Sequence, residues 1–114
     1  MANQSFTKDE RLLARPDFKK VMTQGRKKTV DRTCTLFFLP NSLGRKRLGI
    51  IASRKVGNAV ARNRAKRKIR EIFRRHKNLG EPDMDVVVIS ARKLVNLPYA
   101  ILEKKLTQTL QAAH

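Results

Sequence analysis

Apolar positions near the start of the chain predict two consecutive short helices. Thr7 and Glu10 have the spacing of a capping box, which marks a helix start. Pro16 lacks a backbone N–H and interrupts this helix, and Asp17 restarts it until Gly25 ends it. The apolar residues that share one face of the second helix are Phe18, Val21 and Met22.

Three further apolar runs predict strands. The first, residues 33–39 (TCTLFFL), is followed by the turn residues of PNSLG. The second, residues 48–53, comes at hairpin distance, so we expect it to pair antiparallel with the first. The third, residues 85–90 (DVVVIS), is continuously apolar rather than alternating, which predicts a well buried strand.

A basic amphipathic helix is predicted between the second and third strands, from about residue 58 to residue 77. At 100° per residue, about a third of its circumference is apolar and would pack on a sheet. This side carries Ala61, Ala65, Ile69, Ile72, Phe73 and His76. The opposite side, about 30 Å long, carries Arg64, Lys66, Arg67, Arg70, Arg74 and Lys77.

A last helix is predicted to begin at Asn96, a residue type that favours the N-cap, with Pro98 in its first turn. Leu102, Leu106 and Leu110 form its apolar stripe. The element order is then α-β-β-α-β-α, within a single domain of residues 1–114. This order predicts an α+β sandwich in which helices pack on a small central sheet.

Net charge narrows the class of partner. The 114 residues include 27 Lys or Arg against 9 Asp or Glu, so the formal net charge is +18. Internal ion pairs cannot balance this excess, and a polyanion is the expected partner. Glu71 is the only acid between Ser53 and Arg75, whereas an ordinary solvated helix mixes both signs. A single-sign run of this length indicates nucleic-acid binding.

A longer motif surrounds the Arg-Asn-Arg of residues 62–64. Residues 52–70 (ASRKVGNAVARNRAKRKIR) resemble the signature of the bacterial ribonuclease P protein subunit family, whose hallmark is this Arg-Asn-Arg. Other motifs fall in the family's order: the Arg-x-Asp-Phe of residues 15–18, the RLGI of residues 47–50 and the Ala-Arg-Lys of residues 91–93. The resemblance therefore covers nearly the whole chain.

The resemblance implies a protein that assists a catalytic RNA in the endonucleolytic removal of the 5′ leader from precursor tRNA. It also implies a fold like domain 2 of ribosomal protein S5, with a left-handed βαβ crossover where general topology rules would favour a right-handed one. The implied partners are the ribonuclease P RNA and precursor tRNA, bound by a monomer in a 1:1 complex. We expect a cytoplasmic protein, because no apolar run could span a membrane or serve as the core of a signal peptide.

Two sets of residues are assigned to RNA by the resemblance. The catalytic RNA would contact Lys55, Arg62, Asn63, Arg64, Lys66, Arg67 and Arg70. The leader of precursor tRNA would contact Phe18 and Phe37, since stacking on aromatic rings tolerates any base. Phe37 and Phe38 point to opposite faces of their strand, and the resemblance favours Phe37. Met22 and Ile51 depart from the family's common aromatic and small polar residues, which leaves fine leader preferences open.

No catalytic residue is expected in this chain, because the resemblance implies that Mg²⁺ ions used by the RNA subunit carry the hydrolysis. His76 and His114 are the only imidazoles, and no Cys and His spacing suggests zinc. Glu81, Asp83 and Asp85 could in principle bind Mg²⁺ for phosphodiester cleavage, but these residue types also suit a turn before a strand. We therefore expect no metal site and no tightly bound cofactor in the protein itself.

Two other functions fit the charge. A purely structural RNA-binding protein, such as a ribosomal protein or an RNA chaperone, is the main alternative. A DNA-binding helix-turn-helix is disfavoured, because the basic helix lies between two strands rather than after a short partner helix. Cys34 is the single cysteine and lies in an apolar run, so a buried structural thiol is expected.

Overall fold

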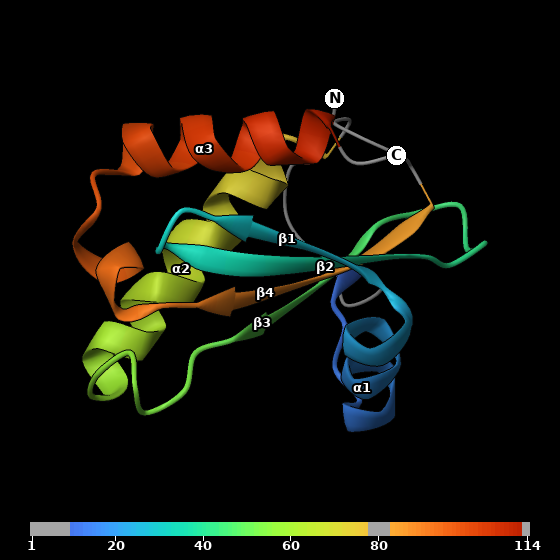
Figure 1. Ribbon diagram of the computed structural model, residues 1–114, viewed down its shortest axis with the longest axis horizontal. Helices are drawn as coiled ribbons and strands as arrows, with labels where there is room; N and C mark the ends of the chain where they lie inside the picture. Colours follow the sequence, from blue (N-terminus) through green and yellow to red (C-terminus); the bar gives the residue numbers. More distant parts are fainter. Residues whose placement is uncertain (1–9, 78–82, 113–114) are drawn as a thin grey trace.

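The computed structural model describes residues 10–77 and 83–112. Within these residues, three α-helices and a four-stranded sheet form an α+β fold (Figure 1). The elements are α1 (Arg15–Gln24), β1 (Arg26–Val30), β2 (Cys34–Pro40), β3 (Arg47–Ile51), α2 (Ala59–Arg75), β4 (Met84–Ser90), the short 3₁₀-helix η2 (Arg92–Asn96) and α3 (Tyr99–Gln111). The predicted fold class is confirmed, with β1 as an additional strand that the sequence did not reveal.

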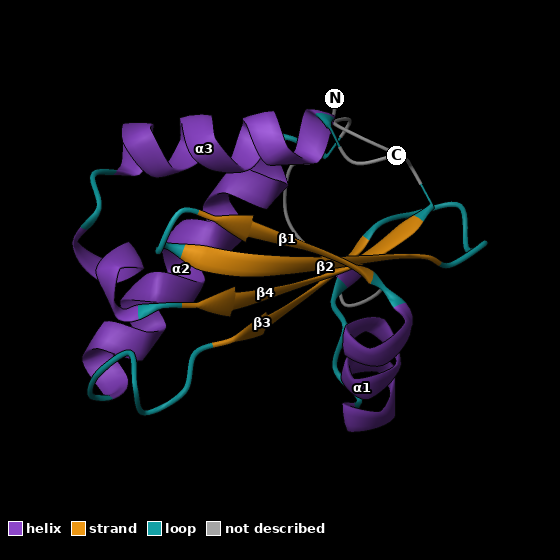
Figure 2. Ribbon diagram, in the orientation of Figure 1, coloured by secondary structure: helices purple, strands orange, loops and turns teal. Residues whose placement is uncertain are grey.

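Strand β4 lies between β2 and β3, in the order β1-β2-β4-β3 (Figure 2). It is antiparallel to β2 and parallel to β3, so the expected antiparallel pairing of residues 33–39 with residues 48–53 is wrong. The reason is the apolar character of β4, which is buried on both faces and therefore takes an interior position. The left hand of the β3-α2-β4 crossover stays a prediction from the resemblance.

Helix boundaries near the prolines also differ from the prediction. Helix α1 begins at Arg15 and holds Pro16 in its first turn, where a missing N–H costs no hydrogen bond, so Pro16 does not interrupt the helix. Asn96 ends η2 rather than capping α3, and Pro98 occupies the N-cap of α3. Thr7 of the predicted capping box lies outside the described residues.

Two apolar clusters hold the helices to opposite faces of the sheet (Figure 1). The larger cluster packs α2 and α3 against one face, and its members include Leu36, Phe38, Ile69, Ile72, Val88, Leu102 and Leu106. The smaller cluster packs α1 against the other face around Val21 and Val87. Cys34 belongs to the larger cluster, where burial raises the pKa of its thiol to about 12. The predicted buried thiol is thus confirmed.

No helix of the described residues is both long and apolar enough to cross a membrane. The apolar residues of α2 and α3 instead form stripes that pack on the sheet.

Candidate nucleic-acid interface

Helix α2 is fixed at its start by a side-chain cap and along its length by one apolar face. The Asn58 Oδ1 accepts a hydrogen bond of 2.9 Å from the Ala61 backbone N–H, which satisfies one of the free donors of the first turn. The buried residues of the helix are Ala65, Ile69, Ile72 and Phe73. The predicted division into an apolar and a basic side is therefore confirmed for the body of the helix.

The residues predicted to contact the catalytic RNA form what we call the basic face: Lys55, Arg62, Asn63, Arg64, Lys66, Arg67 and Arg70. All of them lie on α2 or just before it, and they are exposed or half-buried. Across residues 10–77 and 83–112, none of the cations of this face takes part in an ion pair with a carboxylate. The face is therefore positively charged and open to a ligand that supplies negative charge.

Lys68 lies among these residues in sequence but points into the protein. Its Nζ donates hydrogen bonds to the backbone carbonyl oxygens of Val95 (2.7 Å) and Leu97 (2.9 Å). Burial lowers the pKa of this ammonium, and the nearby Arg64 lowers it further. Lys68 thus ties α2 to the end of η2, and it is the structural exception within a run of outward cations.

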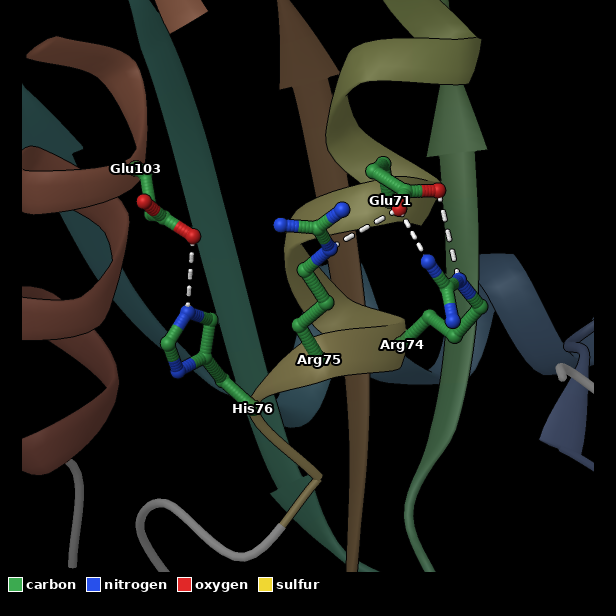
Figure 3. Close-up of polar contacts among 5 residues, drawn as sticks. All are labelled: Glu71, Arg74, Arg75, His76 and Glu103. Carbon is green, nitrogen blue, oxygen red and sulfur yellow. Dashed lines mark hydrogen bonds and ion pairs between the residues drawn. The ribbon is translucent and has the colours of Figure 1, made fainter. Parts of the chain in front are cut away.

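The last turn of α2 is electrostatically different from the basic face. The Glu71 carboxylate accepts hydrogen bonds from Arg74 and, at 2.9 Å, from the Nε of Arg75 (Figure 3). These contacts, led by the hydrogen bond from Arg74, lower the pKa of Glu71. Lys77, also predicted on the outward side, pairs with Glu10 at 3.0 Å. On α2 and in the segment just before it, positive charge without a carboxylate partner is therefore concentrated between Lys55 and Arg70.

His76 does not lie on the apolar stripe of α2, so that prediction is wrong. The helix ends at Arg75 and His76 is its C-cap residue, with a different backbone conformation. Its Nε2 lies 3.0 Å from the Glu103 carboxylate of α3 (Figure 3). The contact joins the end of α2 to α3, and the ring is half-buried rather than part of the core.

Phe18 and Phe37 both lie on the α1 side of the sheet. Both are half-buried and, with Met22, pack against the smaller apolar cluster; we call these three side chains the aromatic surface. Phe38 is only 4% exposed and belongs to the larger cluster on the other side. The structure thus places Phe37, not Phe38, on the same face of the sheet as Phe18, and Ile51 packs against the same cluster.

A hollow of about 210 Å³ joins the aromatic surface to the basic face. Phe18 lines it together with Lys66 and Arg70 of α2. The segment before α1 forms another wall, because the Leu12 N–H donates a 2.9 Å hydrogen bond to the Leu48 carbonyl at the edge of β3. From the sequence, the residues assigned to the catalytic RNA and those assigned to the leader were expected on separate surfaces. Their continuity depends on the position of β3 at the edge of the sheet, which was not predicted.

Asp85, one of the acidic residues near the start of β4, is held by two neighbouring side chains. Asp85 is buried and accepts hydrogen bonds of 2.8 and 2.7 Å from the Arg47 guanidinium and one of 2.8 Å from the Asn41 side chain. The hydrogen bond to Asp85 raises the pKa of Arg47. Asp83 is exposed, and Glu81 lies outside the described residues. Asp85 is therefore a structural partner of Arg47.

Comparisons with known proteins cover nearly the whole chain. The family model described as Ribonuclease P matches residues 6–114. A ribonuclease P protein component from Desulfosudis oleivorans is 44% identical over 105 residues, which cover 91% of this chain and 85% of the relative.

Two solved structures share the fold. The ribonuclease P protein from Thermotoga maritima superimposes with a TM-score of 0.83 at 34% identity, covering 92% of this chain and 98% of that one. The Staphylococcus aureus ribonuclease P protein gives a TM-score of 0.79 at 30% identity, covering 90% and 93%. The similarity therefore extends from the signature motif to the complete architecture.

Proposed function

The chain belongs to the ribonuclease P protein family, and we propose that in tRNA processing it binds the catalytic RNA with its basic face and the precursor-tRNA 5′ leader with its aromatic surface. As a protein component of ribonuclease P it has an RNA partner. Beyond this RNA partner, we assign the catalytic RNA to the basic face and the precursor-tRNA leader to the aromatic surface. The observation that carries it is the open positive charge of the basic face beside a half-buried aromatic surface.

The basic face suits a folded RNA for two reasons. Its Arg side chains are planar multi-donor groups that match phosphate oxygens, and their positions along α2 can follow several phosphates at once. Neutralising those phosphates releases counterions, which favours binding at low salt. Binding would therefore reduce repulsion between RNA strands near the site of cleavage.

The aromatic surface suits a single-stranded leader. Stacking of a base on an aromatic ring contributes about 1–3 kcal/mol and tolerates every base, as a subunit that serves many different precursors requires. Mature tRNA lacks the leader, so these contacts would favour precursor over product. We assign the hydrolysis to the RNA subunit and its Mg²⁺, and no catalytic residue to this chain.

The stoichiometry and location follow from the same proposal. A monomer in a 1:1 complex with the RNA is sufficient, because both surfaces lie on one chain and meet at the hollow beside Phe18. The cytoplasm is the compartment in which we place this complex, since precursor tRNA is the substrate.

Cleavage of a labelled precursor tRNA at low Mg²⁺ tests the proposal. The reaction combines a bacterial ribonuclease P RNA with the protein, and it is compared with each component alone. We expect cleavage at the junction of leader and mature sequence only when both are present. Cleavage by the protein alone would contradict the assignment of chemistry to the RNA. Binding without any gain in cleavage would favour a purely structural RNA-binding protein.

A further inference from the structure

Lys27 borders the aromatic surface on the side away from α2. In the pairing of β1 with β2, Lys27 lies directly opposite Phe37 and Lys28 lies opposite Leu36. Residues directly opposite each other in a sheet share a face. Lys27 is therefore on the α1 side with Phe37, whereas Lys28 is on the side of the larger cluster, to which Leu36 belongs.

The Lys27 side chain is exposed and makes no ion pair or side-chain hydrogen bond within the described residues. It lies on an edge strand, so within the described residues no further strand of the sheet covers the outer side of β1. Its ammonium group is thus accessible to an anion that lies on the aromatic surface.

Cations therefore flank the aromatic surface at both borders. Lys66 and Arg70 line the hollow beside Phe18 on the β3 side, and Lys27 lies on the β1 side. Four strands at a spacing of about 4.8 Å separate these borders by about 14 Å. Aromatic rings between two positive borders match a single strand whose bases stack while its phosphates remain outside.

We infer that Lys27 binds a backbone phosphate of the precursor-tRNA leader, at the end of its path across the sheet from β3 to β1. This inference rests on the leader binding proposed above. The basic face lies on the β3 side with the catalytic RNA, so Lys27 contacts leader nucleotides that are remote from the cleavage junction. A leader that is too short to cross the sheet does not reach it.

Protection of an edge strand offers a different explanation for these lysines, because charged side chains on an edge discourage pairing with other chains. That role would apply equally to Lys27 and Lys28, which are neighbours on the same strand and both exposed. The two residues therefore form a matched pair for an experiment. They differ in the face of the sheet on which they lie.

The experiment measures affinities of the holoenzyme, reconstituted with a bacterial ribonuclease P RNA, for three ligands. These are precursor tRNA with a long leader, precursor with a leader of one or two nucleotides, and mature tRNA. We expect Lys27→Ala to weaken long-leader binding about 3- to 5-fold at low salt and to flatten its salt slope by about 0.7, as for one phosphate on a single strand. Short-leader and mature tRNA should bind as to wild type, and Lys28→Ala should change none of the three.

Two results would overturn the inference. If Lys27→Ala and Lys28→Ala weaken long-leader binding equally, Lys27 contributes only to the net positive charge of the protein and makes no specific leader contact. An unchanged Lys27→Ala alongside a weakened Phe18→Ala would remove Lys27 from the leader path while leaving leader binding intact. Failure of Phe18→Ala to discriminate between precursor and mature tRNA would instead overturn the leader-binding proposal itself.

Discussion

The ring of Phe18 lies against the backbone of Gly49, so closely that a β-carbon at Gly49 would be 2.5 Å from the ring. Glycine at this position of β3 therefore allows the ring to lie over the sheet, at the wall of the hollow that leads to the basic face. The RLGI motif and the Arg-x-Asp-Phe motif, which are far apart in sequence, meet at this contact.

Gly49→Ala is expected to displace the Phe18 ring, because the ring edge is the group nearest to the new methyl. The free energy of unfolding should fall by about 1–3 kcal/mol, as for other overpacked sites. Affinity for precursor tRNA should fall by about 1 kcal/mol or more through lost stacking, while affinity for mature tRNA stays unchanged. Chemical denaturation and binding titrations measure the two effects. An equal loss for both tRNAs would show that the ring position does not affect leader binding.

Lys66 and Lys68 offer a matched pair on one helix, since each substitution by Met removes one charge. Lys68→Met leaves the Val95 and Leu97 carbonyls without their donor, so the free energy of unfolding should fall by about 1–2 kcal/mol. Lys66→Met should instead flatten the log–log salt dependence of RNA binding by roughly 0.7–0.9. The reverse assignment of these two effects would mean that another side of α2 meets the RNA.

Glu71→Gln should strengthen RNA binding at low salt. The carboxylate holds Arg74 and Arg75, and its removal takes a negatively charged partner from two guanidinium groups just beyond the basic face. If both then bind phosphates, the salt slope should steepen by up to roughly 1.4–1.8. Titrations at several salt concentrations measure this slope. A slope equal to that of wild type would indicate that the RNA does not extend to the last turn of α2.

Asp85→Asn tests whether the Asp85 carboxylate has a structural role or binds a metal ion. The substitution removes the charge that faces the Arg47 guanidinium, and loss of a charged hydrogen-bond partner in this part-buried pair should cost about 1–3 kcal/mol of unfolding free energy. Below its melting temperature the variant should still support cleavage by the ribonuclease P RNA. A folded variant that no longer supports cleavage would indicate that Asp85 takes part in the cleavage reaction.

Much of the fold was predictable from local pattern. The basic helix, the strands near residues 33–39 and 85–90, and the apolar stripe of α3 follow from periodicity and were found at those positions. Strand β1 was missed because Arg26, Lys27 and Lys28 give RKKTV no apolar alternation. It forms through backbone pairing with β2 at the edge of the sheet, where charged side chains remain in water.

The remaining errors concern relations between distant elements. The continuous apolar run of β4 indicates burial on both faces and therefore an interior strand. The wrong strand order was predicted because strands that are adjacent in sequence were expected to pair. The alternation of side chains along a strand was enough to predict that Phe37 and Phe38 point to opposite faces of the sheet. Only the packing of α1 determined which of the two lies on the same face as Phe18. Lys68 was assigned to neither side of the helix, because its acceptors are backbone carbonyls of another element, which sequence does not reveal.

If RNA binds on the basic face, removal of its cations must flatten the salt dependence of binding. The most direct measurement is the salt dependence of ribonuclease P RNA binding for Arg64→Ala/Arg67→Ala, compared with Lys28→Ala/Lys104→Ala. The second pair is a control of equal charge, because both lysines are exposed and lie on β1 and α3. We predict that the slope flattens by roughly 1.4–1.8 for the α2 pair alone, as for two phosphates. Equal changes in slope for the two pairs, or no change for the α2 pair, would show that RNA does not bind on the basic face.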